Sequence, residues 1–220
     1  MESAASSPNF GRPWSASRKR YFRLNEFATD AVLLALRAPD IYAIWVHKRL
    51  GAKMREMVMV TVSAANACRF CGFVHSRWAE HVAVSAATVE RLYALDPDAF
   101  EPRTGSALAY ARARVLADFA RIDPALEREA LARNSEQELR DIELVARVMT
   151  LANRSTNNID ALLARIQGEP VEGSRALDEW VIGTASALGL ITMVPALCVW
   201  RRQSPFALAR DFRRFSRTLR

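Results

Sequence analysis

The chain has 220 residues, half of them hydrophobic and a quarter charged, a balance typical of one soluble globular domain with extensions. Three cysteines are too few for the disulfide framework of a small secreted scaffold. The formal net charge of +7 belongs to the ends, since residues 201–220 contribute +6, residues 1–23 contribute +4, and the remainder is about −3. This distribution argues against a basic core that binds nucleic acid.

The N-terminal segment MESAASSPNFGRPW lacks a basic region followed by an apolar one, so no secretory signal is expected. Residues 1–20 are rich in Ser, Ala and Pro, and we expect them to form a mobile arm. The predicted localisation is cytoplasmic. In a reducing cytoplasm a CxxC pair is more often catalytic or metal-binding than structural.

From residue 21 onward the hydrophobic residues recur with helical spacing, and no stretch alternates with the period of a strand. The predicted fold class is all-α: a compact multi-helix domain over 21–170, followed by a C-terminal helical extension over 171–220. Ser135 and Glu138 fit a capping box. Helices are expected near 23–37, 39–50, 53–65, 67–82, 85–95, 104–121, 124–133, 136–153 and 157–167.

Residues 180–200, WVIGTASALGLITMVPALCVW, contain no charge and have Trp at both ends. This segment fits a transmembrane helix in length and flanking aromatics, although a span would carry either the whole domain or seven arginines across the membrane. Pro195 and several small residues instead suit a helix buried in the core or between subunits. A third alternative is contact with a membrane surface through the basic amphipathic tail. In that tail an apolar stripe of Leu208, Phe212, Phe215 and Leu219 lies beside Arg210, Arg213, Arg214 and Arg217.

The segment NACRFCGFVHSRW, residues 66–78, contains two of the three cysteines and one of the three histidines. On a helix with about 100° per residue, Cys71 lies about 60° from Cys68, and His75 about 20° from Cys68. Asn66 is a good N-cap residue, which would place both cysteines near a helix N-terminus. Unpaired N–H groups and the helix dipole favour a thiolate there. The pattern therefore indicates a redox dithiol, provided that local geometry permits a disulfide.

Glu56 lies among apolar side chains in AKMREMVMVTVSAA. A carboxylate in such surroundings could exchange protons near neutral pH. The alternative is a glutamate that faces water and pairs with Lys53 or Arg55.

The spacing Glu-x11-Cys-x2-Cys-x3-His resembles the signature of the alkylhydroperoxidase D branch of the carboxymuconolactone decarboxylase-like family. It is formed here by Glu56, Cys68, Cys71 and His75. The apolar lead-in REMVMVTVSAANACRFC is similar to the helix that precedes the cysteines in that family. Two later segments, ALAYARA at 107–113 and LVARVMTLANRSTNNIDALL at 144–163, resemble its following helices. The resemblance covers about 53–82 and 104–164 and is absent from the first 20 and the last 50 residues.

The resemblance implies an all-helical protein that assembles into trimers or higher homo-oligomers and reduces hydroperoxides without a bound cofactor. Cys71 would attack the peroxide, Cys68 would resolve the sulfenate as a disulfide, and His75 with Glu56 would relay protons. A dihydrolipoyl group on a partner protein would reopen the disulfide. Phe70 departs from the pattern, because family peroxidases often carry a histidine just before the second cysteine.

Four other interpretations stay open. Cys68, Cys71 and His75 could bind zinc, with Glu56 or His81 as fourth ligand. The thiols could be structural. The chain could also be a lactone decarboxylase-like enzyme of the family's other branch, or a redox-sensing module at a membrane surface. The preferred hypothesis is a cysteine-based alkyl hydroperoxide reductase.

Overall fold

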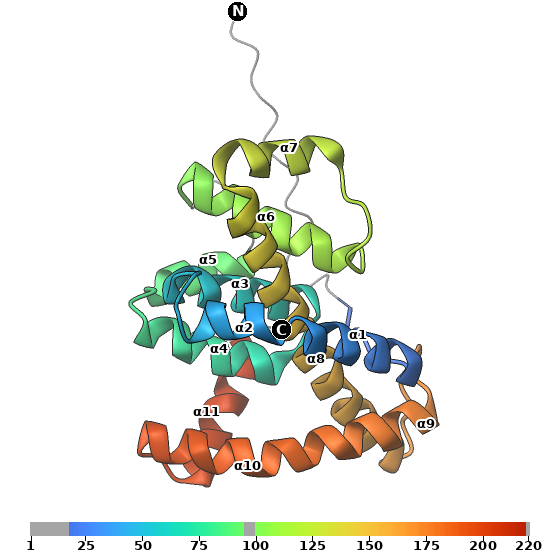
Figure 1. Cartoon of the computed structure of the whole chain (residues 1–220). Coiled ribbons are helices and arrows are strands. Elements are labelled where there is room, and N and C mark those ends of the chain that lie inside the picture. Colours follow the sequence, from blue (N-terminus) through green and yellow to red (C-terminus); the bar gives the residue numbers. More distant parts are fainter. Residues whose placement is uncertain (1–17, 95–99, 219–220) are drawn as a thin grey trace, which may run out of the picture.

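The computed structural model describes residues 18–94 and 100–218, and within these ranges it is all-α with no strand, which confirms the predicted fold class. Figure 1 shows helices α3 to α8 stacked above a C-terminal pair, α10 and α11. The elements are α1 (Leu24–Leu36), α2 (Ala38–Trp45), α3 (Ala52–Ala65), α4 (Arg69–His81), α5 (Ala86–Ala94), α6 (Pro102–Leu116), α7 (Pro124–Arg133), α8 (Glu136–Ile166), α9 (Ala176–Asp178), the π-helical η3 (Glu179–Gly183), α10 (Thr184–Arg201) and α11 (Pro205–Thr218).

Helix α8 starts at Glu136 as predicted, and the capping box predicted there forms only in part. The Ser135 hydroxyl accepts the backbone N–H of Glu138 at 3.1 Å, as an N-cap should. The Glu138 carboxylate bonds to Arg103 at 2.6 Å instead of returning to the cap, so only half of the capping box forms. The end of α6 also differs from the prediction, because this helix ends at Leu116, five residues before the predicted end.

Helix α8 is one helix of 31 residues, and the prediction of two helices broken at 154–156 was wrong. Asn153, Asn157 and Asn158 favour turns because their side chains compete for backbone groups. Here tertiary partners occupy these side chains: Asn157 Nδ2 donates to Asn66 O at 2.8 Å, and Asn158 Nδ2 donates to Phe22 O at 3.1 Å. Partners far away in sequence therefore keep the helix continuous where local preference would end it.

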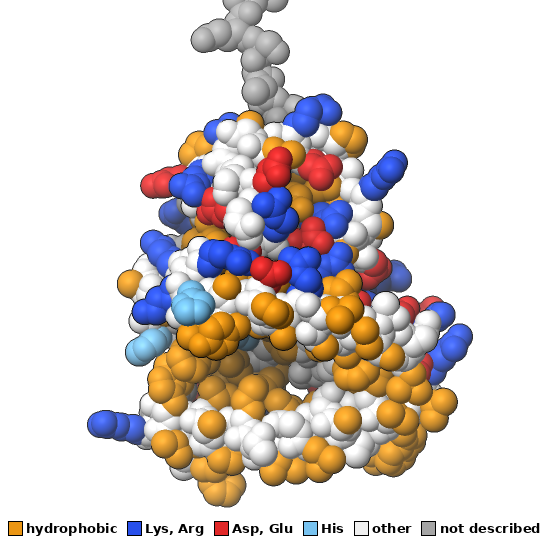
Figure 2. All heavy atoms as spheres, in the orientation of Figure 1, with side chains coloured by type: hydrophobic (Ala, Val, Ile, Leu, Met, Phe, Trp, Pro, Cys, Tyr) orange, Lys and Arg blue, Asp and Glu red, His pale blue; other side chains and the backbone are white. Residues whose placement is uncertain are grey.

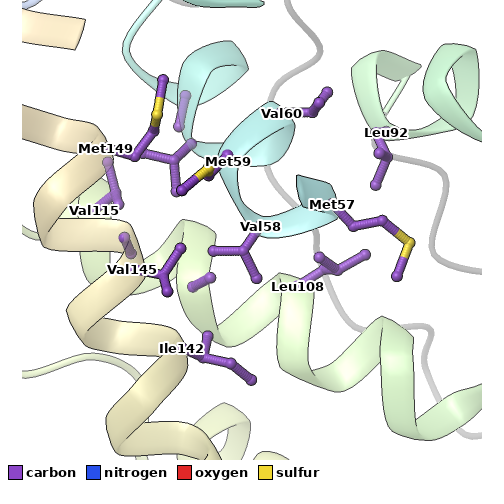
Figure 3. Close-up of a cluster of buried hydrophobic side chains, with 14 of the residues drawn as sticks. Met57, Val58, Met59, Val60, Leu92, Leu108, Val115, Ile142, Val145 and Met149 are labelled. Carbon is purple, nitrogen blue, oxygen red and sulfur yellow. The ribbon is translucent and has the colours of Figure 1, made fainter. Parts of the chain in front are cut away.

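The core surrounds α3. Every residue over 56–65 is buried, because α3 is enclosed by α4, α5, α6 and α8. Figure 3 shows Val58 of α3 facing Leu108 of α6 and Ile142 and Val145 of α8. A helix that is apolar on nearly all sides belongs inside a bundle. Any polar side chain on α3 is consequently held in a dry environment.

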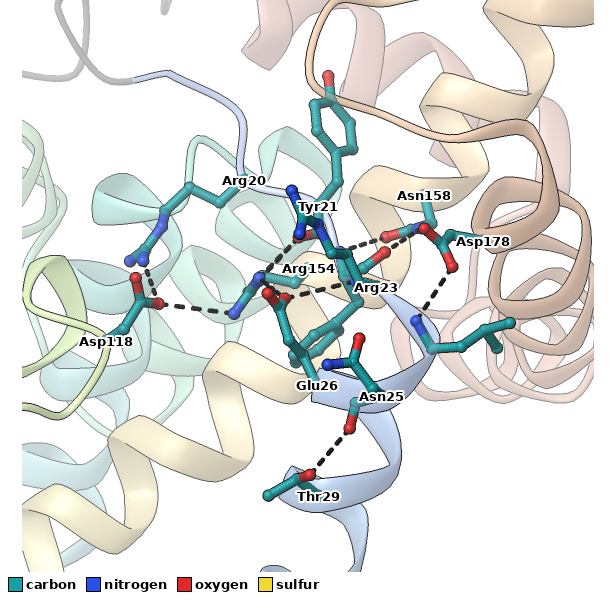
Figure 4. Close-up of polar contacts among 12 residues, drawn as sticks. Arg20, Tyr21, Arg23, Asn25, Glu26, Thr29, Asp118, Arg154, Asn158 and Asp178 are labelled. Atoms are coloured by element: carbon teal, nitrogen blue, oxygen red, sulfur yellow. Dashed lines mark hydrogen bonds and ion pairs between the residues drawn. The ribbon is translucent and has the colours of Figure 1, made fainter.

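Residues just before and at the start of α1 bond both to α8 and to Asp178 of α9 (Figure 4). Arg154 of α8 donates to Tyr21 O at 2.7 Å, and the Asn158 side chain bonds to both backbone groups of Phe22. Leu24 N donates to Asp178 Oδ1 at 3.1 Å. Residues 18–20 of the predicted mobile arm are held as well, since Arg20 pairs with Asp118, whereas residues 1–17 lie outside the described ranges.

The apolar segment at the C-terminus forms α10, which runs along the lower edge of the molecule in Figure 1. Residues 176–200 are long enough and apolar enough to cross a membrane, with a mean hydropathy of 1.9, yet only 22% of that window is buried. The helix is therefore not a core helix of this chain. Figure 2 shows hydrophobic side chains along this edge and a hollow between it and the body above.

Candidate active site

The turn between α3 and α4 places the two cysteines. Asn66 was predicted as the N-cap of the cysteine helix but instead ends α3, and Ala67 follows in the left-handed region with φ of 50°. Helix α4 therefore begins at Arg69, and Cys68 is its N-cap residue. The Cys68 sulfur accepts the backbone N–H of Cys71 at 3.4 Å, so one thiol occupies the helix N-terminus and the other lies in its first turn.

Buried polar groups hold this turn in place. Asn157 Nδ2 of α8 donates to Asn66 O at 2.8 Å, and Asn66 Nδ2 donates to Thr150 Oγ1 at 3.3 Å. Cys68 N donates to Ser63 O at 3.0 Å. The left-handed Ala67 is a strained conformation for a residue with a side chain, and these bonds compensate for it. The position of the dithiol is thus set by α8 as well as by its own helix.

Both thiols are free and buried, with Cys68 1% and Cys71 6% exposed. Burial raises the pKa of Cys68 well above its ordinary value, and the neighbouring Cys71 sulfur adds to the rise. The N–H of Cys71 acts in the opposite direction but is outweighed. For Cys68 the expectation that the helix N-terminus favours a thiolate was therefore wrong, because desolvation is the larger effect.

Glu56 and His75 form a hydrogen-bonded pair beside the dithiol. Glu56 Oε2 lies 2.9 Å from His75 Nδ1, and their side chains are 9% and 21% exposed. The water-facing alternative for Glu56 is wrong, although Arg55 Nε does lie 3.9 Å from its other oxygen. Because a carboxylate accepts the Nδ1 proton, His75 keeps Nε2 free as a base. Cys71 and His75 are one turn apart on α4 and so share its face.

Thr156 was not anticipated by the sequence. Its Oγ1 lies 3.6 Å from Cys71 Sγ and donates to Ala152 O at 2.8 Å. The two residues are 85 positions apart, and a threonine in the polar run RSTNN carries no signal of its own. Only the packing of α4 on α8 brings this hydroxyl to the thiol.

The C-terminal extension covers the outer side of α4. The ring centroids of Phe70 and Phe73 on α4 lie 5.8 and 5.6 Å from that of Phe212 on α11, and Phe215 lies 5.6 Å from Phe73. Leu208 is buried in the same cluster. The apolar stripe of the tail therefore packs inward on α4 through Leu208, Phe212 and Phe215. Leu219 lies outside the described residues.

The zinc alternative finds no ligand set. Within residues 18–94 and 100–218, no group of three or more His, Cys, Asp or Glu side chains is arranged to hold a metal ion. His81, the suggested fourth ligand, packs instead against the rings of Trp78 and Trp200 at centroid distances of 6.0 and 5.5 Å.

Residues 30–113 match the model of the Carboxymuconolactone decarboxylase family. The matched range includes all four predicted site residues, Glu56, Cys68, Cys71 and His75, and ends within α6. Helix α8 with Thr156 and the C-terminal extension lie beyond it. No curated protein and no solved structure matches the chain.

Proposed function

We propose that the protein is a cysteine-based oxidoreductase of the alkylhydroperoxidase D type, which reduces alkyl hydroperoxides through a Cys68–Cys71 dithiol–disulfide cycle. The observation that carries the proposal is the 2.9 Å bond between Glu56 and His75, one helical turn from a buried thiol pair. A buried carboxylate–imidazole pair next to a cysteine is suited to taking the thiol proton and returning it to a leaving group.

In the first step His75 accepts the Cys71 proton, and the thiolate attacks one peroxide oxygen. The S–O bond forms as the O–O bond breaks, and the alkoxide leaves as an alcohol with the proton from His75. Cys71 becomes a sulfenic acid and the peroxide is reduced. Glu56 orients the imidazole and stabilises its charged form while it holds the proton.

In the second step the Cys68 sulfur attacks the sulfenic sulfur, and water leaves as the disulfide forms. The raised pKa of Cys68 supports this division of roles, since the more deeply buried thiol stays protonated until its partner is oxidised. A dithiol reductant then reopens the disulfide by exchange and is itself oxidised. We propose a dihydrolipoyl group on a partner protein as that reductant, and a cytoplasmic homo-oligomer as the working form.

Phe70 takes no part in this relay, because its ring packs against Phe212. In this proposal the Glu56–His75 pair alone supplies the proton transfers that a histidine before the second cysteine would share.

The test is free-thiol counting and intact mass on the reduced protein, before and after one equivalent of cumene hydroperoxide. We expect loss of two thiols and two mass units, mapped to Cys68 and Cys71. Cys71→Ser should consume no peroxide, and Cys68→Ser should stop at a sulfenate that dimedone traps. Cys198→Ser is the matched control, because this third cysteine is buried in a cluster with Leu208 of α11 and its loss should leave peroxide consumption unchanged. Normal turnover by Cys71→Ser would refute the proposal.

The family match also supports a second candidate, acid–base chemistry on a lactone, which needs Glu56 and His75 but no thiol pair. Decarboxylation of a γ-carboxymuconolactone that persists in a Cys68→Ser, Cys71→Ser double variant would favour this candidate over the peroxidase.

A further inference from the structure

Helix α10 presents a long apolar stripe to solvent. Leu188 and Ile191 are 61% and 65% exposed, and Val199 is exposed further along the helix. At about 100° per residue, five exposed positions lie within an arc of about 80°. They are Thr184, Leu188, Ile191, Pro195 and Val199. A contiguous uncharged stripe of this length normally meets another apolar phase.

Both ends of α10 are attached to the same body. At its start Ile182 is buried and Gly183 lies against the backbone carbonyl of Asn158 in α8. At its end Trp200 stacks on Trp78 of α4, with ring centroids 4.0 Å apart and planes 14° apart. A helix of 18 residues is about 27 Å long, so the whole of α10 would be needed to cross a hydrocarbon core of about 30 Å. Both of its ends would then have to leave the contacts that attach them to the body. While both attachments hold, α10 can only lie parallel to a membrane surface.

Helix α11, which follows α10 in the chain, carries positive charge on the side away from α4. Phe206, at its first turn, is 87% exposed and lines one shallow groove with Arg210, Arg213, Arg214 and Arg217. In the described parts of the chain, no ion pair joins these four arginines to an acidic side chain. The inner face of α11 is occupied by α4, so the arginines are what this helix offers to solvent.

We propose that α10 and α11 form a docking surface for a membrane that contains anionic lipid, with α10 lying in the plane of the interface. The uncharged face of α10 and the arginine row of the following helix together meet the two requirements for such binding: apolar area to insert among the headgroups, and charge to attract acidic lipids. A two-fold contact with a second copy through this surface would instead bring two sets of four arginines into one interface. The proposal does not depend on the reaction that the thiols perform.

The test is flotation of the full chain with vesicles of phosphatidylcholine and phosphatidylglycerol in equal parts, and with vesicles of phosphatidylcholine alone. We expect binding to the anionic vesicles that weakens as salt rises, and much weaker binding to the neutral ones. Leu188→Gln with Ile191→Gln, and separately Arg213→Gln with Arg214→Gln, should each lower the vesicle affinity roughly tenfold or more.

Matched controls are available outside α10 and α11. Val32→Gln with Leu36→Gln removes exposed apolar side chains from α1, and Arg121→Gln with Arg128→Gln removes exposed charge near and on α7. Both should bind as the unchanged protein does. If they lose as much affinity as the α10 and α11 variants, the docking surface is wrong.

Two further results would overturn the proposal. One is failure of the unchanged protein to float with anionic vesicles at low salt. The other is a Leu188→Gln, Ile191→Gln variant that binds vesicles normally but has fewer subunits by light scattering, which would assign the stripe to a second copy. Should a variant misfold, the tryptophan fluorescence of the unchanged protein provides a second test, because Trp180, just before α10, is half-exposed. Vesicles with brominated anionic lipid should quench the fluorescence of the unchanged protein more than that of Trp180→Phe, and equal quenching would contradict the proposal.

Discussion

Replacing Glu56 by glutamine should slow the reaction of Cys71 with hydroperoxide while leaving the fold intact. The substitution keeps the shape of a side chain that is 9% exposed but removes the charge 2.9 Å from His75 Nδ1. The imidazole then loses the acceptor that fixes its Nδ1 proton and stabilises the charged ring during proton transfer.

The size of the effect follows from that one bond. A hydrogen bond to a charged group contributes about 1.5–3 kcal/mol, and both side chains are exposed too little for water to replace it fully. At about 1.36 kcal/mol for each factor of ten, the rate should fall roughly 10- to 150-fold. His75→Ala removes the base itself and should cost about 10²–10⁴-fold. The double variant should be no slower than His75→Ala, because Glu56 acts through His75.

The assay is single-turnover loss of hydroperoxide by the reduced protein, followed beside disulfide formation with diamide, which releases no alkoxide. We expect Glu56→Gln to slow both reactions, because each begins with transfer of the Cys71 proton to His75. The peroxide reaction should slow more, because only that reaction returns a proton to an alkoxide, and the urea midpoint should stay nearly unchanged. Glu80→Gln is the matched control, since this α4 glutamate pairs with Arg77 at the surface. A loss below about threefold in the peroxide reaction would contradict a role in proton transfer.

Three further outcomes follow from named contacts. Because the raised pKa of Cys68 means that the folded chain holds this proton more tightly, its contribution to stability is complete below a pH of about 8.5 and is lost above it. The free energy of unfolding, measured with urea under reducing conditions, should therefore fall more steeply at alkaline pH in the unchanged protein than in Cys68→Ala. Parallel curves for the two proteins would contradict this. Gly183→Ala should destabilise by about 1–3 kcal/mol, since its Cβ would lie 2.9 Å from Asn158 O, whereas Gly189→Ala, with nothing within 4 Å, should stabilise by up to about 1 kcal/mol in urea unfolding. Thr156→Val should slow peroxide attack about tenfold and Thr156→Ser should not, in the same single-turnover assay; equal rates would make the hydroxyl structural.

Local pattern was sufficient for some features and failed for others. The helical spacing of apolar residues and the Ser135 cap predict helices that the structure contains, because helix formation depends on neighbours in sequence. The unbroken α8 and the N-cap position of Cys68 were not predictable in this way. Both depend on Asn157 bonding to the turn at Asn66, a contact across 91 positions.

Local pattern alone predicts the all-α class and the placing of Cys71 and His75 on one helix face, because residues four positions apart share a face, with Cys68 close to the start of that helix. It also determined that residues 180–200 would be uncharged and apolar. The packing of distant helices was needed to show that Glu56 reaches His75, that Thr156 reaches Cys71, and that the tail's apolar stripe covers α4 while α10 stays exposed. An apolar pattern predicts that one face of a helix is buried, but which surface buries that face depends on how distant elements pack.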